Sequence, residues 1–175
     1  MSVAVTRCAG LPPYGPLARG FPAHWGALGR EGVVVEFRSE AGSWIGNFAP
    51  GEFRLDLVAV HPNGRDAVVV SRGSVFVVDV AAGTAECVDE TVAALEVSEP
   101  PGWVFDSCGL SLFRLGPDGI MWRTPRISWD GFEALEVRGD EVVGLCWDIS
   151  DSWLPFRVCL RTGDVISCPT RFSEP

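Results

Sequence analysis

The chain has 175 residues, of which 47% are hydrophobic, and a formal net charge of −9 at pH 7. This length and composition suit one globular domain, since a folded chain of this size removes roughly 70% of its extended-chain surface from water. The acidic charge argues against a nucleic-acid groove and against an anionic membrane surface, because both require a basic face.

The cysteines and the first residues of the chain bear on its compartment. Six cysteines are scattered singly, and no Cys-x-x-Cys pair of the kind that holds structural zinc is present. Residues 1–17 lack the basic and apolar stretches of a secretory signal, and no apolar run approaches the length of a membrane span. All the basic residues are arginine, which is typical of GC-rich coding. We therefore predict an acidic bacterial protein of the cytoplasm with free thiols, no metal and no cofactor.

The N-terminal residues are dense in proline and glycine. Residues 11–26 (LPPYGPLARGFPAHWG) leave no room for a regular element. Three aromatic residues in this stretch, Tyr14, Phe21 and Trp25, favour a segment anchored over the end of a sheet. The prediction is a single all-β domain over residues 1–175, in which residues 1–30 form an irregular lead-in and residues 31–170 form hairpin repeats.

Short apolar strands separated by glycine turns follow. Strands are predicted at Val33–Phe37, Ser43–Phe48, Phe53–Val60, Ala67–Ser71 and Val75–Val80. The last of these, VFVVDV, is apolar on both faces and is typical of a central strand. The next segment, Glu90–Val97, is compatible with a short helix or with a strand.

The second half of the chain repeats this pattern. Strands are predicted at Trp103–Asp106, Leu110–Leu115, Ile120–Arg123, Phe132–Arg138, Glu141–Trp147, Leu154–Leu160 and Val165–Cys168. The loop Gly139-Asp140 suits a primed or bulged hairpin turn. Successive hairpins of this kind predict a protein built from antiparallel sheets.

A constant shift of eighty positions overlays two of these hairpins. It places Phe76 on Phe156, Val78 on Val158, Val80 on Leu160 and Gly83 on Gly163. Half of this shift is close to the period of one propeller blade, about 40 residues. We therefore predict a propeller-like fold of about four small blades, with a plain antiparallel barrel or sandwich as the alternative.

The densest group of polar and aromatic residues lies within Gly116–Gly131. It contains Trp122, Arg123, Arg126, Trp129 and Asp130. In a binding interpretation, the two arginines clamp an anionic group and a tryptophan supplies a stacking wall. In a structural interpretation, Trp129 fills the core and Arg126 pairs with Asp130. Both interpretations stay open at this point.

The run WRTPRISWDG, with VVGLCWD and FRVCLRTGDV further along, resembles a pattern in uncharacterised bacterial β-repeat proteins. In that pattern a W-R-[ST]-x-R-[LI]-S-W-D-G motif follows a DG turn, and the chain ends in F-x-V-D-L-x-T-G. This chain departs from the pattern at Cys159, where the pattern has aspartate. The resemblance implies a β-repeat architecture and no particular activity.

Motifs of catalysis and metal binding are weak or missing in the sequence. The loop WDISDSW places Asp148 and Asp151 as in the start of a calcium loop, but Trp153 stands where that loop requires glycine. A solvated turn closed by Asx-type hydrogen bonds is therefore the preferred interpretation. No nucleophile elbow, P-loop or dinucleotide fingerprint is present.

Two hypotheses of function follow. The first is a non-enzymatic, cytoplasmic protein-binding module, for example a bacterial immunity or accessory protein for a basic partner. The second is a small-ligand or carbohydrate-binding β protein with an Arg/Trp pocket formed by the five residues named above. Neither hypothesis involves nucleic acid or a membrane. The sequence leaves enzymatic activity open and favours a protein without it.

Overall fold

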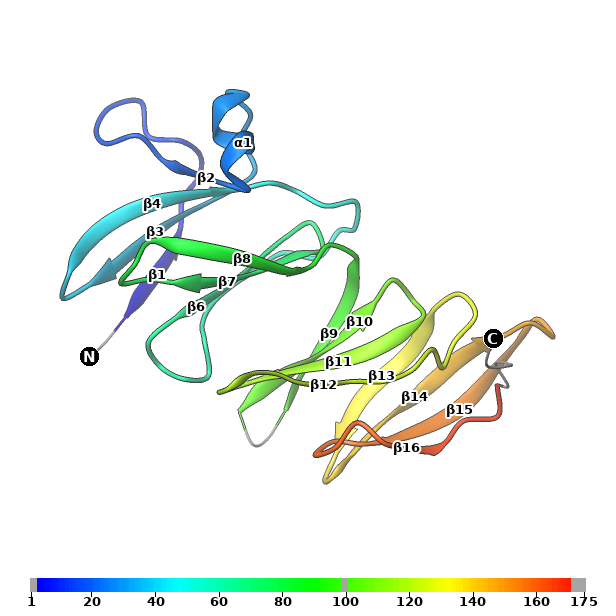
Figure 1. The fold of residues 1–175 in the computed structure, drawn as a ribbon. Helices are drawn as coiled ribbons and strands as arrows, with labels where there is room; N and C mark the ends of the chain where they lie inside the picture. Colours follow the sequence, from blue (N-terminus) through cyan, green and yellow to red (C-terminus); the bar gives the residue numbers. More distant parts are fainter. Residues whose placement is uncertain (1–2, 99–100, 171–175) are drawn as a thin grey trace. The chain divides into compact units, whose positions relative to one another are not determined.

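The structure is a computed structural model that describes residues 3–98 and 101–170 (Figure 1). Contacts along the backbone group the chain into two compact units, Met1–Thr91 and Val92–Pro175, and each is described here by itself. Strands dominate both units. The helix α1, Ala23–Ala27, has five residues. No helix in the described residues is long and apolar enough to cross a membrane.

The first unit contains two four-stranded sheets. Sheet 1 has the order β1 (Ala4–Arg7), β3 (Val33–Ser39), β4 (Gly42–Phe48) and β2 (Arg19–Phe21). Sheet 2 has the order β5 (Leu57–Val60), β6 (Ala67–Ser71), β7 (Ser74–Asp79) and β8 (Thr84–Asp89). β7 lies inside its sheet, as the apolar pattern of its sequence predicts.

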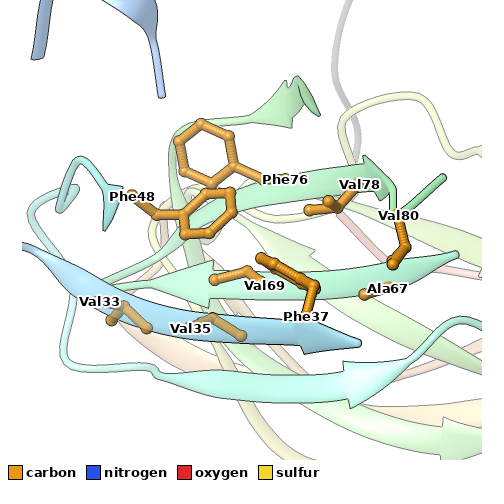
Figure 2. Packing of buried hydrophobic residues seen from close by; sticks show 9 residues of the cluster. All are labelled: Val33, Val35, Phe37, Phe48, Ala67, Val69, Phe76, Val78 and Val80. Atoms are coloured by element: carbon orange, nitrogen blue, oxygen red, sulfur yellow. The ribbon is translucent and has the colours of Figure 1, made fainter. Parts of the chain in front are cut away.

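The core of the first unit consists of alternate residues of these strands, because side chains two apart share one face of a strand. Its buried members are Val33, Val35, Phe37, Phe48, Ala67, Val69, Phe76, Val78 and Val80 (Figure 2). The Phe48 and Phe76 rings lie next to each other, with 5.2 Å between their centroids. The Trp44 indole N–H donates to the Val80 carbonyl at 2.9 Å and closes one side of this core.

The lead-in differs from the prediction, because it contains β1, β2 and α1. β2 pairs in parallel with β4, from Arg19 opposite Gly46 to Phe21 opposite Phe48, so the prediction of purely antiparallel sheets is wrong here. Glycine makes this turn of chain possible: a Cβ at Gly20 would lie 2.2 Å from the backbone nitrogen of Gly26. The glycines therefore allow a close approach of two backbone segments instead of breaking the structure.

The three aromatic residues of the lead-in have different environments. Phe21 stacks on Phe48 with 5.1 Å between ring centroids, so it anchors the segment as predicted. Trp25 is half-buried beneath the Arg30 guanidinium. Tyr14 is 89% exposed and anchors nothing, which corrects the prediction for that residue.

The second unit also contains two four-stranded sheets, and their strands follow one another along the chain. Sheet 3 is formed by β9 (Val92–Ser98), β10 (Gly102–Ser107), β11 (Ser111–Gly116) and β12 (Gly119–Arg123). Sheet 4 is formed by β13 (Phe132–Arg138), β14 (Glu141–Asp148), β15 (Ser152–Cys159) and β16 (Val165–Ser167). The short loop Gly139-Asp140 joins β13 to β14 as predicted.

Two elements of the structure differ from those predicted from the sequence. The segment Glu90–Val97 holds no helix: β9 pairs with β10, and this tertiary pairing prevails over local helix propensity. The strand expected at Phe53–Val60 begins only at Leu57. Before that point the chain bonds to the next hairpin turn, where Phe53 N–H donates to the Arg72 carbonyl at 3.0 Å.

The core of the second unit repeats the plan of the first. Its buried members are Val104, Leu112, Trp122, Ile127, Val142, Cys146, Phe156, Val158 and Leu160. The Trp122 indole N–H donates to the Leu160 carbonyl at 2.8 Å, as Trp44 does to Val80.

The overlay of eighty positions corresponds to equivalent places in the two units. Phe76, Val78 and Val80 lie in the first core, and Phe156, Val158 and Leu160 lie in the second. Gly83 and Gly163 have φ of +68° and +77°, and each N–H donates at 2.9 Å to the carbonyl four residues earlier. The prediction of an all-β fold with about four small sheets is therefore confirmed.

Candidate functional site

The five predicted site residues do not form one group. Trp122 and Arg123 are neighbours in β12, so their side chains point to opposite faces of sheet 3. Trp122 is only 7% exposed and belongs to the core. Arg123 lies on the other face, with its guanidinium 4.4 Å from the centre of the Phe113 ring. The strand thus separates two residues that are adjacent in sequence.

The other three residues lie together in the loop between β12 and β13. The Arg126 guanidinium lies over the Trp129 ring, 4.6 Å from its centre. Arg126 also donates through Nε to the Ser128 carbonyl at 3.0 Å and through Nη2 to the Trp129 carbonyl at 3.1 Å. Trp129 is half-buried and Asp130 is exposed. The loop therefore presents this arginine, indole and carboxylate near the protein surface.

Hydrogen bonds fasten the loop to the end of β14. The Trp129 N–H donates to the Trp147 carbonyl at 2.9 Å, and the Trp147 N–H donates to the Ser128 hydroxyl at 3.1 Å. The same hydroxyl donates to the Gly131 carbonyl at 2.6 Å. Ser128 is fully buried, so its single hydroxyl fixes the loop against the strand.

Two further tryptophans stand at this end of sheet 4. Trp147 of β14 is directly opposite Trp153 of β15, and their rings meet edge to face with 4.9 Å between centroids. Their neighbours Cys146 and Leu154 contact the core, so both indoles lie on the opposite face of the sheet. We call residues 126–131 and 147–153 together the tryptophan end of the second unit.

Three carboxylates belong to the tryptophan end: Asp130, Asp148 and Asp151. Asp148 accepts hydrogen bonds from the Ser150 N–H at 3.0 Å and the Ser150 hydroxyl at 2.6 Å, which is the turn that the sequence predicts. These bonds hold the pKa of the Asp148 carboxyl below its usual value, and the bond from the Ser150 hydroxyl contributes most. Ile149 at the tip of the turn is 73% exposed. The Asp148 carboxylate therefore stays ionised beside apolar surface.

These three carboxylates differ from others of the same sheet. Glu136, Asp140 and Glu141 each pair with an arginine, whereas Asp130, Asp148 and Asp151 pair with no arginine of residues 3–98 and 101–170. Within those ranges no group of three His, Cys, Asp or Glu side chains is placed to hold a metal ion. Within the described residues, the tryptophan end thus carries three carboxylates that form no ion pair with an arginine.

The indole faces differ in the same way. Arginines of this chain lie over Trp25, Trp44 and Trp129. Among the described residues, no arginine lies over Trp147 or Trp153. A cation above an indole face is attracted by the ring quadrupole, so these two half-buried rings offer a place for a cation from another molecule.

Three hollows are found in the first unit, and none of them is lined by the five predicted residues. One, of about 530 Å³, is lined by His24, Glu52, Cys87 and Glu90 among others. Burial and the nearby Glu90 carboxylate raise the pKa of the Cys87 thiol to about 11. The thiol therefore stays protonated near neutral pH and is a poor nucleophile.

Trp147 and Trp153 are not among the site residues predicted from the sequence. The string WDISDSW contains the necessary information, because a tight hairpin turn between the two indoles brings them opposite each other across the strands.

Comparisons with known proteins add little. No family model matches the chain, and no curated protein matches it. Among the solved structures to which the chain is similar is dihydro-heme d1 dehydrogenase NirN in complex with DHE, with 12% identity and a TM-score of 0.45. The match covers 79% of this chain and 34% of that chain, so this chain spans about a third of that protein. Nothing about ligand or activity follows from a similarity at this level.

Proposed function

We propose that the protein is a non-enzymatic binding module that contacts a basic segment of another protein through the tryptophan end. The observation that carries the proposal is the combination of two indoles without an arginine of their own and three carboxylates without an ion pair, within the described residues. An immunity or accessory protein for a basic partner is one concrete version of such a module.

Arginine and lysine side chains fit this surface for two physical reasons. A guanidinium over an exposed indole contributes about 0.5–1 kcal/mol, and about 2 kcal/mol once the contact is desolvated. A surface ion pair contributes about 0–1 kcal/mol more. The net charge of −9 further speeds the approach of a basic partner, and salt weakens this steering.

The chemistry of the tryptophan end supports binding over catalysis. Its side chains include carboxylates, hydroxyls, indoles and one arginine, but no histidine or cysteine. A carboxylate with a lowered pKa, such as that of Asp148, is a weak general base near neutral pH. Such a surface is better suited to hold a cation than to transfer a proton.

The proposal is tested by isothermal titration with a nona-arginine peptide at low salt. The variant D130N/D148N/D151N removes the three carboxylates of the tryptophan end, and the control E40Q/E86Q/D118N removes three exposed carboxylates elsewhere. Both variants change the net charge equally. We expect the first variant to weaken binding about tenfold and the control to change it less than about twofold. Equal losses in both variants would show attraction by net charge alone and would refute the proposal.

The alternative of a small-ligand or carbohydrate-binding protein uses part of the same surface, since Arg126, Trp129 and Asp130 lie in it. Trp122 is in the core and Arg123 is on another sheet, so the five-residue pocket is reduced to three. Titration of the same protein with a neutral oligosaccharide distinguishes the two functions: heat from the sugar and none from the peptide would favour the alternative.

A further inference from the structure

A hollow of about 300 Å³ in the first unit plays no part in the proposed function. It is lined by the loop of residues 11–18 and by the chain at the end of α1, which lie side by side in Figure 1, and by Asn47 of β4. Sites for small molecules in proteins begin at about this volume. The hollow is therefore large enough for a small organic ligand.

Side-chain hydrogen bonds hold the segments that line this hollow. The Leu11 N–H donates to the Glu31 carboxylate at 3.0 Å, which ties the start of the loop to the chain after α1. Asn47 is 3% exposed, and its amide donates to the Arg30 carbonyl at 2.8 Å and accepts the Gly32 N–H at 2.9 Å. A buried side chain thus fixes the backbone that carries Arg30.

The loop of residues 11–18 presents apolar side chains to solvent. Leu11, Tyr14 and Leu17 are 38%, 89% and 96% exposed. Three prolines in the same loop restrict its backbone, so covering it with a ligand costs less conformational entropy than covering a flexible loop. Apolar surface gathered around a hollow favours a ligand with an apolar body.

Arg30 supplies the charge of the hollow. Among the described residues that line it, Arg30 is the only one that is charged near neutral pH. Its guanidinium lies 5.9 Å from the centre of the Trp25 ring, and it forms no ion pair with a carboxylate of residues 3–98 and 101–170. A guanidinium binds a carboxylate through two parallel hydrogen bonds, so the complementary ligand carries a carboxylate.

We propose that this hollow binds a small carboxylic acid with an apolar body, whose carboxylate pairs with Arg30 while its body covers the loop of residues 11–18. The net charge of −9 repels a free acid at long range, so the apolar contact has to contribute to the affinity together with the ion pair. The site belongs to the first unit and does not depend on the tryptophan end.

The test follows the indole N–H signals of the full chain by NMR during titration with phenylacetate, with phenylacetamide and phenethylamine as the matched neutral and cationic probes. Phenylacetate should shift the Trp25 signal saturably, because pairing alters the cation over that ring. We expect it to bind about tenfold more tightly than the amide, and the amine to bind more weakly still. Trp44 is the internal control, since the Arg19 guanidinium over it already donates to the Gly83 carbonyl at 2.9 Å.

Three variants separate the charge from the apolar wall. R30M should weaken phenylacetate binding about tenfold, whereas R65M, which removes an exposed arginine elsewhere in the first unit, should change it less than about twofold. L17S replaces a side chain that is 96% exposed, so folding is unaffected, and should weaken binding about threefold.

The wild-type titrations decide the matter without any variant. Equal affinity for the three probes, or a Trp25 signal that stays in place up to about 10 mM phenylacetate, would overturn the proposal. Equal losses in R30M and R65M would also overturn it, because they would show attraction by net charge alone.

Discussion

In the first unit the fourth strand of sheet 1 is β2, which precedes both central strands in the sequence, whereas in the second unit the four strands of each sheet follow one another. The regular sheets are those that the hairpin pattern predicts. The exception forms where Arg19–Phe21 pairs in parallel with Gly46–Phe48. A local pattern of strand, glycine turn and strand thus predicts meanders well, but it contains no information about a strand recruited from further away.

The two cores nevertheless follow one plan. Each contains a phenylalanine and two aliphatic residues at equivalent positions in and just after one strand, β7 in the first unit and β15 in the second. In each unit, a tryptophan indole N–H donates to the carbonyl of the residue that directly follows this strand. Matched substitutions in the two units test how far this equivalence extends.

The largest effect is expected from truncating the equivalent phenylalanines. Phe76→Ala and Phe156→Ala each remove a buried ring, and we expect each to lower the free energy of unfolding by about 3–5 kcal/mol. Urea denaturation followed by tryptophan fluorescence measures the loss. Ile166→Ala, at a side chain that is 48% exposed, serves as the control and should change stability by less than about 0.5 kcal/mol.

These two truncations also test the assignment of each core to its unit. Hydrogen exchange should rise mainly within residues 33–91 for Phe76→Ala and mainly within residues 102–170 for Phe156→Ala. A pair of losses that differ by more than about 2 kcal/mol would contradict the equivalence of the two positions.

Alanine substitutions at the turn glycines should lower stability by different amounts, although the backbones of these glycines are similar. Gly163→Ala would place a Cβ 2.8 Å from the buried Trp122 ring, whereas at Gly83 the nearest atoms belong to the movable end of the Arg19 side chain. Gly139 has φ of +59° with no atom within 4 Å, so Gly139→Ala isolates the backbone strain of about 1–2 kcal/mol.

We therefore expect Gly163→Ala to lose the most stability, Gly83→Ala an intermediate amount, and Gly139→Ala the least. Thermal unfolding of the three variants gives the order. Equal losses at all three positions would mean that Trp122 moves aside freely, contrary to its place in the core.

Smaller losses should follow removal of the two indole N–H donors. Trp122→Phe leaves the Leu160 carbonyl without its donor in a buried setting and should cost about 1–3 kcal/mol, cavity effects aside. Trp44 is only half-buried, so water can replace its bond to Val80, and Trp44→Phe should cost less. Chemical denaturation compares them, and a larger loss at Trp44 would contradict this ranking.

The smallest expected effect is a pH dependence confined to the first unit, which contains both histidines. His61 is 3% exposed, and its Nδ1 accepts the Asn63 N–H at 3.2 Å. Burial lowers the pKa of His61 below its usual value of about 6.5. Between the two pKa values the unfolded chain holds more protons than the folded chain, so stability should fall as the pH drops below about 6.5.

Thermal unfolding between about pH 7 and pH 5 measures how stability changes with pH, because this range brackets the usual histidine pKa of about 6.5. His61→Asn keeps an acceptor for the Asn63 N–H and should remove the histidine part of the slope. His24→Asn, at an exposed position, should leave it unchanged. An unchanged slope in His61→Asn would assign the pH dependence to other groups.

The sequence predicts the repeated hairpins because alternation and turn glycines are local properties, as Phe76–Gly83 and Phe156–Gly163 demonstrate. The candidate site was predicted only in part. Nearness in sequence grouped Trp122 with Arg123, although alternation along a strand sends neighbours to opposite faces. Trp147 and Trp153 were missed because their meeting depends on the register of β14 with β15.

The proposed binding surface is tested most directly by the indole N–H signals of the seven tryptophans during titration with the nona-arginine peptide. The account predicts that the signals of Trp129, Trp147 and Trp153 shift together and saturate. The signals of Trp44 and Trp122, whose N–H groups are bonded to carbonyls, should stay in place. Shifts spread evenly over all the indoles, or confined to the first unit, would contradict the assignment of binding to the tryptophan end.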